Sequence, residues 1–494
     1  MPGPLPGHDH PLHAPLLGPG ERVQVVRLSA GQEWLGLDVP SSTLFWLSDS
    51  AWGLLAEAGG VSGSAPPPLG TESPTLRDEA RDELVRLLQQ GDITRLSPTP
   101  EPHPPDAATQ PVTSLSLGIS TRCNLRCRYC FGRQHDGPDG VLYHQPREHM
   151  PRHVALAAVD FLFRHAGDAP VVTVNFFGGE PLLNPEVVRD TGTAALERAR
   201  AENRQVEFAM TTNGTLLDQA RLDMLGDLGI RPLISLDGPR EVHDAARPFA
   251  NGRGSYRSAA DGARRALARD PSLMARATMN GQCTSYVEIA ESLLRLGFRR
   301  LHITAASPVN PAFGLGREGF DALHAPFTAF CDWYLHGVEE GRFRDFFFGP
   351  LDHLIGDLYR RRVGVYPCTA GLTGLYVTPA GDLYPCFRAV RPEYRLGSVL
   401  DDGFDGSLRR PFFAAAADRR PACADCWARY ICRGECMGDN LDENGDIGTP
   451  TPARCRLTHH YVAEAARCLA HLSRHVPSVL PERFPSTPPP GCRA

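Results

Sequence analysis

Three cysteines lie close together in the stretch CNLRCRYC, at Cys123, Cys127 and Cys130. Three thiolates can hold three irons of a four-iron cluster, which leaves the fourth iron open to a small molecule. Zinc is the alternative, because a zinc site usually takes a fourth Cys or His ligand and His135 is nearby. The spacing favours an iron–sulfur cluster with one open iron.

A second group of seven cysteines occupies the last third of the chain, where Gly381 precedes one of them by five positions. These seven are Cys368, Cys386, Cys423, Cys426, Cys432, Cys436 and Cys455. Their regular spacing indicates further metal ligands, either for iron–sulfur clusters or for a pair of structural zinc ribbons. The remaining four, Cys283, Cys331, Cys468 and Cys492, fit no such pattern.

Alternating strands and helices must position the first cysteine group. Strands are predicted at residues 112–120, 171–177, 205–211, 231–237, 275–280 and 299–305. Amphipathic segments separate them, which favours a parallel sheet wound into a barrel. Six such units indicate an open, partial barrel.

Chemically distinctive residues follow these strands, at the barrel end where ligands of parallel α/β folds gather. Cys123 follows the first strand, and GGEP, at 178–181, follows the second. The glycines allow backbone carbonyls and the Glu180 carboxylate to approach a charged amine closely. Ser235 and Asp237 occupy alternate positions of the fourth strand and so are expected on one face.

The spacing C-x3-C-x2-C, with Tyr129 and Phe131 beside the last cysteine, resembles the radical S-adenosylmethionine (SAM) superfamily. The resemblance implies that SAM chelates the open iron and that an electron splits its sulfonium to a 5'-deoxyadenosyl radical. Arg247 is a candidate countercharge for the SAM carboxylate, with a surface ion pair as its alternative. The implied cofactor-binding residues are Phe131, Gly178, Gly179, Glu180, Pro181, Asn213, Ser235 and Arg247.

The seven later cysteines resemble the SPASM extension of radical SAM enzymes, which holds two auxiliary four-iron clusters. The resemblance assigns one cluster to Cys423, Cys426, Cys432 and Cys455, and the other to Cys368, Cys386 and Cys436. Seven thiols cannot close two four-iron sites. The second cluster therefore either takes Cys331 or Cys283 as a further ligand or keeps an open iron that binds a substrate thiol. Three 4Fe-4S clusters are expected in all.

The N-terminal part predicts three short strands, at 22–28, 33–39 and 42–47, followed by a helix at 48–60 and another from Pro74. This pattern resembles the winged-helix peptide-recognition element of peptide maturases. In that element a leader peptide adds a strand to the edge of the sheet.

The expected fold is α/β, a partial (β/α)6 radical SAM barrel with a winged-helix-like module before it and a Cys-rich SPASM domain after it. Pro-rich composition predicts disordered tails and a semi-rigid, unpacked connector. The predicted parts are a tail (1–19), the peptide-recognition module (20–96), a linker (97–110), the barrel (111–310), a bridging region (311–365), the SPASM domain (366–475) and a second tail (476–494).

Composition excludes several classes of partner. The formal net charge is −6 and no basic run stands out, so neither nucleic acid nor an anionic membrane surface is an expected partner. No stretch reaches the roughly 18 apolar residues of a membrane span, and the first residues do not resemble a secretion signal. We therefore expect a cytoplasmic protein with reduced thiols.

The three parts together resemble thioether-forming maturases, including those for six-cysteine peptides and for quinohemoprotein amine dehydrogenase subunits. The resemblance implies a ribosomally made precursor peptide or protein subunit as substrate, and an electron donor such as flavodoxin or ferredoxin. Asp237 is the candidate proton acceptor, with a structural role in the DG turn as its alternative. Alternatives for the whole chain are an anaerobic sulfatase maturase that makes formylglycine, a carbon–carbon crosslinking or epimerising maturase, and a zinc-stabilised peptide-binding scaffold.

Overall fold

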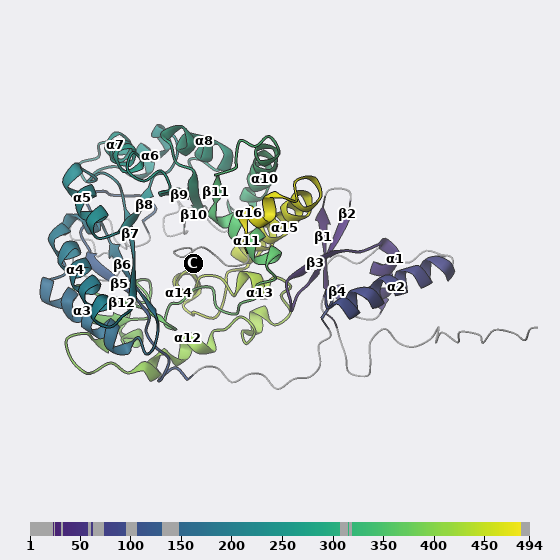
Figure 1. Cartoon of the computed structure of the whole chain (residues 1–494), viewed down its shortest axis with the longest axis horizontal. Helices are drawn as coiled ribbons and strands as arrows, with labels where there is room; N and C mark the ends of the chain where they lie inside the picture. Colours follow the sequence, from purple (N-terminus) through teal and green to yellow (C-terminus); the bar gives the residue numbers. More distant parts are fainter. Residues whose placement is uncertain are drawn as a thin grey trace, which may run out of the picture. The chain divides into compact units, whose positions relative to one another are not determined.

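The computed structural model (Figure 1) describes residues 23, 25–30, 33–57, 61–62, 74–94, 106–130, 148–306, 315 and 319–485. The chain divides into two compact units. The first comprises Met1–Pro102 with Asp357–Val363, and the second comprises His103–Gly356 with Gly364–Ala494. Phe131, His135 and Cys492, which the sequence analysis considered, lie outside the described residues.

The first unit is a small sheet with two helices. Its elements are β1 (Val25–Ala30), β2 (Glu33–Asp38), β3 (Thr43–Trp46), α1 (Asp49–Glu57), β4 (Val61–Ser62) and α2 (Pro74–Gln90). The strand order is β3-β2-β1-β4, antiparallel except that β4 runs parallel to β1. The structure thus has the three strands and two helices expected here, and adds β4, which is too short to show a period in sequence. Trp52 of α1 and Leu84 of α2 are buried in the core of this unit.

The second unit contains a ten-stranded sheet of order β11-β10-β9-β8-β7-β6-β5-β12-β13-β14. Its six central strands run parallel in chain order, which confirms the predicted barrel units. They are β5 (Ser114–Ser120), β6 (Val171–Gly178), β7 (Gln205–Thr212), β8 (Arg231–Ser235), β9 (Met274–Met279) and β10 (Arg300–Ala305). Figure 1 shows helices along the outer side of this curved sheet. These are α3 (Arg152–His165), α4 (Pro185–Ala201), α5 (Gln219–Asp227), α6 (Arg240–Ala246), α7 (Tyr256–Leu267) and α8 (Tyr286–Leu296).

Strand register determines which side chains enter the barrel. In β9 the side chains alternate, so that Ala275 and Ala277 are buried while Arg276 and Thr278 are half-buried. The register pairs Arg276 with Ser235 of β8, and both residues line the cavity described below. Alternate positions of neighbouring strands therefore form one polar wall of the barrel interior.

The Cys-rich part continues the barrel sheet, because β12 (Gly374–Val377) pairs in parallel with β5. β13 (Asp382–Tyr384) and β14 (Gly397–Ser398) then add in antiparallel order. The helices of this part are α12 (Arg410–Ala414), α13 (Arg429–Cys432), α14 (Met437–Asn444), α15 (Pro452–His475) and α16 (Val479–Arg483). The bridging elements before it are α10 (His324–Glu339), β11 (Phe347–Phe348) and α11 (Gly349–Tyr359). Short 3-10 helices occupy Pro181–Leu183, Asp321–Leu323, Pro392–Tyr394, Gly406–Arg409 and Pro421–Cys423.

Two segments predicted to be unpacked are packed. Within the predicted linker, residues 106–110 form a turn, because the buried Arg409 guanidinium donates to Ala107 O and, at 2.8 Å, to Gln110 O. Within the predicted C-terminal tail, α16 buries Leu480, and Arg483 is ion-paired with Asp352 at 2.9 Å. Among the described helices, none has the length and apolar content that crossing a bilayer requires.

Candidate functional site

The three cysteines that follow β5 line a cavity of about 540 Å³ at the carboxyl end of the barrel strands. Their loop is fastened to the segment after α6, where Arg126 N donates to Pro248 O at 2.7 Å. Cys123, Cys127 and Cys130 therefore meet at the edge of the sheet where the sequence predicted a ligand site.

The two glycines of GGEP pack against this cysteine loop with no room for a side chain. A Cβ on Gly178, whose φ is +132°, would lie 2.1 Å from Ser120 O, and one on Gly179 would lie 2.4 Å from Arg122 O. Gly179 N also donates to Ser120 O at 2.7 Å. The turn after β6 thus presents bare backbone to the cavity beside Cys123.

Glu180 has a different position from the glycines that precede it. Its buried carboxylate accepts hydrogen bonds from Asn213 N at 2.7 Å, Thr212 Oγ1 at 2.8 Å and Leu182 N at 3.1 Å. Burial raises the pKa of this carboxyl group, although these donors oppose the shift. Glu180 ties the ends of β6 and β7 together and is not among the residues that line the cavity, and neither is the buried Pro181.

The other predicted cofactor-binding residues within the described part of the chain reach the cavity. Asn213 donates to Asn124 Oδ1 at 2.8 Å and lies 3.9 Å from Cys123 Sγ. The predicted residues that line the cavity with the cysteines are Gly178, Gly179, Asn213, Ser235 and Arg247. The carboxyl ends of four strands, β5, β6, β7 and β8, therefore contribute residues to one site.

Asp237 is not placed as the predicted proton acceptor. The strand ends at Ser235, and the Asp237 side chain is fully buried instead of lining the cavity. Its carboxylate accepts from Tyr129 Oη, from Arg247 Nε at 2.9 Å and from Thr278 N at 3.0 Å. These contacts show a structural role, in which Asp237 holds Arg247 and the cysteine loop in position.

Two thiols of the loop have raised pKa values. Burial raises the pKa of Cys127 to about 12, against the opposing charge of Arg247. Burial, followed by the nearby Cys127, raises the pKa of Cys123 as well. Since iron binds thiolates, cluster assembly must displace these protons.

Four of the later cysteines lie together, and we call Cys423, Cys426, Cys432 and Cys455 the outer auxiliary group. Burial raises the pKa of Cys455 to about 12, and Glu435, Cys426 and Cys423 add to the shift. Burial also raises the pKa of Cys432, with a smaller contribution from Cys426. Cys426 thus interacts electrostatically with each of the other three thiols, whereas the assignment of the four to one cluster stays a prediction.

The other three form what we call the inner auxiliary group, Cys368, Cys386 and Cys436. Burial raises the pKa of Cys386 to about 11, and the next contribution that raises it comes from Cys368. Burial and Asp439 raise the pKa of Cys436 to about 12, with a smaller contribution from Cys386. Among the seven later cysteines, Cys436 is the one that lines the cavity with the first cysteine group.

Both candidates for a fourth ligand of the inner auxiliary group have partners outside that group. The buried Cys331 hydrogen-bonds Cys468, between α10 and α15. Cys283 lies 3.6 Å from Glu288 Oε2. Within the part of the chain that the structure describes, this group has three thiols.

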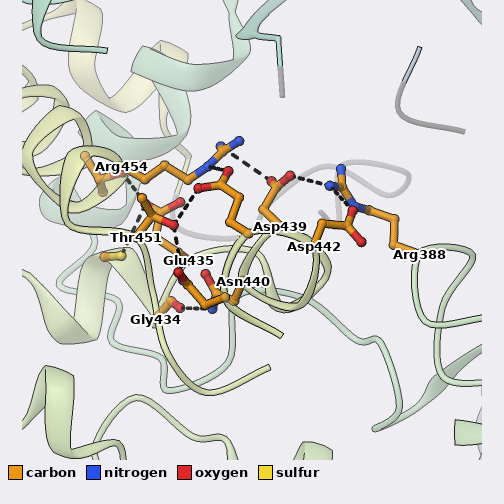
Figure 2. Close-up of polar contacts among 12 residues, drawn as sticks. Arg388, Gly434, Glu435, Asp439, Asn440, Asp442, Thr451 and Arg454 are labelled. Carbon is orange, nitrogen blue, oxygen red and sulfur yellow. Dashed lines mark hydrogen bonds and ion pairs between the residues drawn. The ribbon is translucent and has the colours of Figure 1, made fainter. Parts of the chain in front are cut away.

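A charged network that the sequence analysis missed forms the cavity wall beside Cys436 (Figure 2). Asp439 bridges two arginines, at 2.7 Å from Arg388 and at 3.5 Å from Arg454, and Arg454 also contacts Glu443 at 2.7 Å. Arg388, Asp439 and Arg454 each lie one to three positions from a cysteine, which is the signal in sequence that could have identified them. The network joins the segments that carry Cys386, Cys436 and Cys455.

The donor sets fit iron–sulfur clusters. No three His, Cys, Asp or Glu side chains of the described ranges are placed to hold a single metal ion. The thiolates of a four-iron cluster each bind a different iron and so do not need that close arrangement. The cysteine loop would hold a cluster with one open iron facing the cavity, and the outer auxiliary group would supply a complete set of four thiolates.

Comparisons with known proteins agree with this arrangement. Residues 117–272 match the model of the radical SAM superfamily, and residues 368–427 match that of the SPASM iron–sulfur cluster-binding domain. The mycofactocin maturase MftC of Mycobacterium ulcerans is 28% identical over 68% of this chain and 86% of its own length. A serine-type anaerobic sulfatase-maturating enzyme of Klebsiella aerogenes is 24% identical over 66% of this chain and 80% of its own length.

A solved structure shares the fold. Native anSMEcpe with bound AdoMet has a TM-score of 0.62 and 18% identity, over 74% of this chain and 100% of that one. The parallel barrel sheet, the cysteine loop after its first strand and the Cys-rich extension match the two domains in order. The chain therefore carries a radical SAM domain followed by a C-terminal SPASM iron–sulfur cluster-binding domain.

Proposed function

We propose that this protein is a radical SAM enzyme that modifies a ribosomally made peptide or protein subunit by forming crosslinks from cysteine sulfur to carbon. The observation that carries the proposal is that one cavity is lined by the cysteine loop and by Cys436 of the inner auxiliary group. A substrate in this cavity would contact both the site of radical formation and an auxiliary cluster. The inner auxiliary group has three described thiols, so its cluster would keep a position for a substrate thiolate.

The residues of the cavity have distinct proposed tasks. The backbone of Gly178 and Gly179 receives the amine of SAM, and Arg247, held by Asp237, receives its carboxylate. When bound, the reduced SAM cluster supplies the electron that splits SAM into methionine and a 5'-deoxyadenosyl radical. The wall formed by Asp439 and Arg454 faces the substrate across the cavity.

The proposed reaction balances as an oxidation that removes two hydrogen atoms from the peptide. One hydrogen atom leaves a peptide carbon and ends in 5'-deoxyadenosine. The cysteine thiol gives up its proton, the sulfur binds that carbon, and one electron is released, which clusters held by the outer and inner auxiliary groups would accept. An external donor such as flavodoxin or ferredoxin supplies the electron that begins each turnover, and three 4Fe-4S clusters serve the cycle.

The sheet of the first unit supports the proposal that the substrate is a peptide. β3 lies at one edge of its sheet, and no strand of the described residues pairs with the free side of β3. Trp46 at the end of β3 is 37% exposed. A leader peptide would add as a strand to this edge, so that main-chain hydrogen bonds hold the precursor.

Formylglycine formation on a sulfatase is the second candidate, because the Klebsiella aerogenes relative is named for that activity. Co-expression of the chain with a Cys-containing peptide encoded beside its gene distinguishes the two. Thioether formation predicts loss of two hydrogen atoms per crosslink and of one thiol that reacts with iodoacetamide. Formylglycine predicts an aldehyde that reacts with hydrazine. A peptide of unchanged mass, recovered while SAM is still cleaved, would contradict the crosslinking proposal.

A further inference from the structure

Two neighbouring histidines of α15 have different surroundings. His460 Nε2 lies 3.1 Å from Thr328 Oγ1 and faces α10. His459 Nε2 lies 3.2 Å from Cys426 Sγ, in the outer auxiliary group. His459 follows Cys455 by four positions, so the helix carries both on one face, one turn apart. α15 thus brings a ligand and an imidazole to the same cluster site.

The imidazole of His459 is held in place on its other side. Its ring lies over that of Trp427, with centroids 5.0 Å apart and planes inclined by 38°. Trp427 directly follows Cys426, so the residue after the ligand also fixes the ring beside the ligand. Both side chains are half-buried, which limits the access of water to this side of the site.

The chemistry of the pair fixes the direction of the hydrogen bond. A thiolate that binds iron has no proton to give, so it can only accept. The proton of the bond must therefore lie on Nε2 of His459. Reduction adds negative charge to a cluster and its sulfurs, and a donor at a sulfur stabilises that charge, which raises the reduction potential.

We propose that His459 is a positioning residue that donates a hydrogen bond to Cys426 Sγ and raises the reduction potential of the outer auxiliary cluster relative to the inner one. The outer cluster would then accept the electron that the substrate releases near Cys436. This last role rests on the proposed function, whereas the hydrogen bond and its effect on the potential do not.

The test is a potentiometric titration followed by electron paramagnetic resonance, on full-length protein reconstituted with iron and sulfide without oxygen. All variants carry Cys123→Ala, Cys127→Ala and Cys130→Ala, so that only the auxiliary clusters titrate. His459→Leu removes the donor, and His459→Gln keeps an N–H at a similar reach. His460→Gln is the matched control on the same helix, and iron content is measured first.

With His459→Leu we expect one of the two midpoint potentials to become more negative by about 59 mV. For a one-electron reduction, this shift lowers the equilibrium constant of reduction tenfold. The other midpoint should stay unchanged, and His459→Gln should shift less than the leucine variant. If the leucine variant loses iron, His459→Phe, which keeps a ring, replaces it.

Unchanged midpoints in His459→Leu would overturn the proposal. Equal shifts in the leucine and glutamine variants, or a shift as large in His460→Gln, would also overturn it, since the effect would then come from displacement of α15. Neither SAM nor a peptide is present in the titration. Unchanged midpoint potentials would therefore not count against the proposed function. Likewise, absence of peptide modification would not count against the hydrogen bond from His459.

Discussion

At the scale of single residues, the shape of the cavity depends on the glycines of GGEP, whose backbone carries no side chain. Gly179→Ala would place a Cβ 2.4 Å from Arg122 O, and backbone atoms cannot move aside as a flexible side chain can. We expect a displaced cysteine loop and a cost of about 1–3 kcal/mol, which lowers SAM cleavage roughly tenfold or more. Chromatographic assay of 5'-deoxyadenosine, with iron content measured in parallel, checks this.

Gly226→Ala is the matched control, because Gly226 lies in α5 and a Cβ there has no neighbour within 4 Å. Alanine in a helix interior is favoured by about 1 kcal/mol over glycine, so this variant should keep its activity and gain stability. Full activity of Gly179→Ala would show that the close backbone contact is not needed.

At the scale of elements, the period of the hydrophobic residues predicted the six barrel strands well, because strands such as β6, β9 and β10 bury alternate residues. The same alternation predicted that the Asp237 side chain shares one face with Ser235, and this prediction was wrong. β8 ends at Ser235, so the alternation no longer applies two residues later, and the carboxylate turns toward Arg247.

Some contacts of the site have no signal in the sequence, even where the residues that make them do. The division of the later cysteines into two groups came from their resemblance to the SPASM extension. The pairing of Asp439 with Arg388 and the approach of His459 to Cys426 depend on how distant segments pack. A single arginine or histidine in a sequence does not show its partner, so these contacts required the structure.

Composition also misassigned residues 106–110, whose proline-rich surroundings predicted an unpacked connector. The buried Arg409 donates to Leu372 O at 2.6 Å, to Gln110 O at 2.8 Å and to Ala107 O. Arg409→Ala would leave these carbonyls without their donor, at a cost of about 3 kcal/mol. Urea unfolding should show the loss of stability, and protease should cleave the variant faster within 97–110.

Arg410→Ala is the control for this variant, since Arg410 is exposed and adjacent to Arg409. Arg409→Lys should restore little stability, because an ammonium group lacks the planar fork that reaches several carbonyls at once. Equal stability of Arg409→Ala and Arg410→Ala would show that the buried guanidinium does not hold residues 106–110.

At the scale of the whole molecule, the two units divide the proposed work. Every residue that lines the cavity belongs to the second unit, and the edge strand β3 belongs to the first. Removal of residues 1–102 should therefore leave SAM cleavage nearly unchanged. Modification of a leader-bearing precursor should fall about a hundredfold or more, because the tethered docking step is lost.

Mass spectrometry of the precursor and assay of 5'-deoxyadenosine on the same samples separate these two effects. A precursor that lacks its leader is the matched control, since its modification should be equally slow with both chains. Unchanged modification of the full precursor by the truncated chain would show that the first unit does not recognise the leader.

The central claim is that the cluster held by the cysteine loop opens onto the cavity and cleaves SAM. The most direct measurement is the release of 5'-deoxyadenosine by protein purified without oxygen and supplied with SAM and dithionite. We predict release by the native chain and none by a variant with Cys123→Ala, Cys127→Ala and Cys130→Ala. No release from the iron-loaded native chain, or equal release from the variant, would contradict this account.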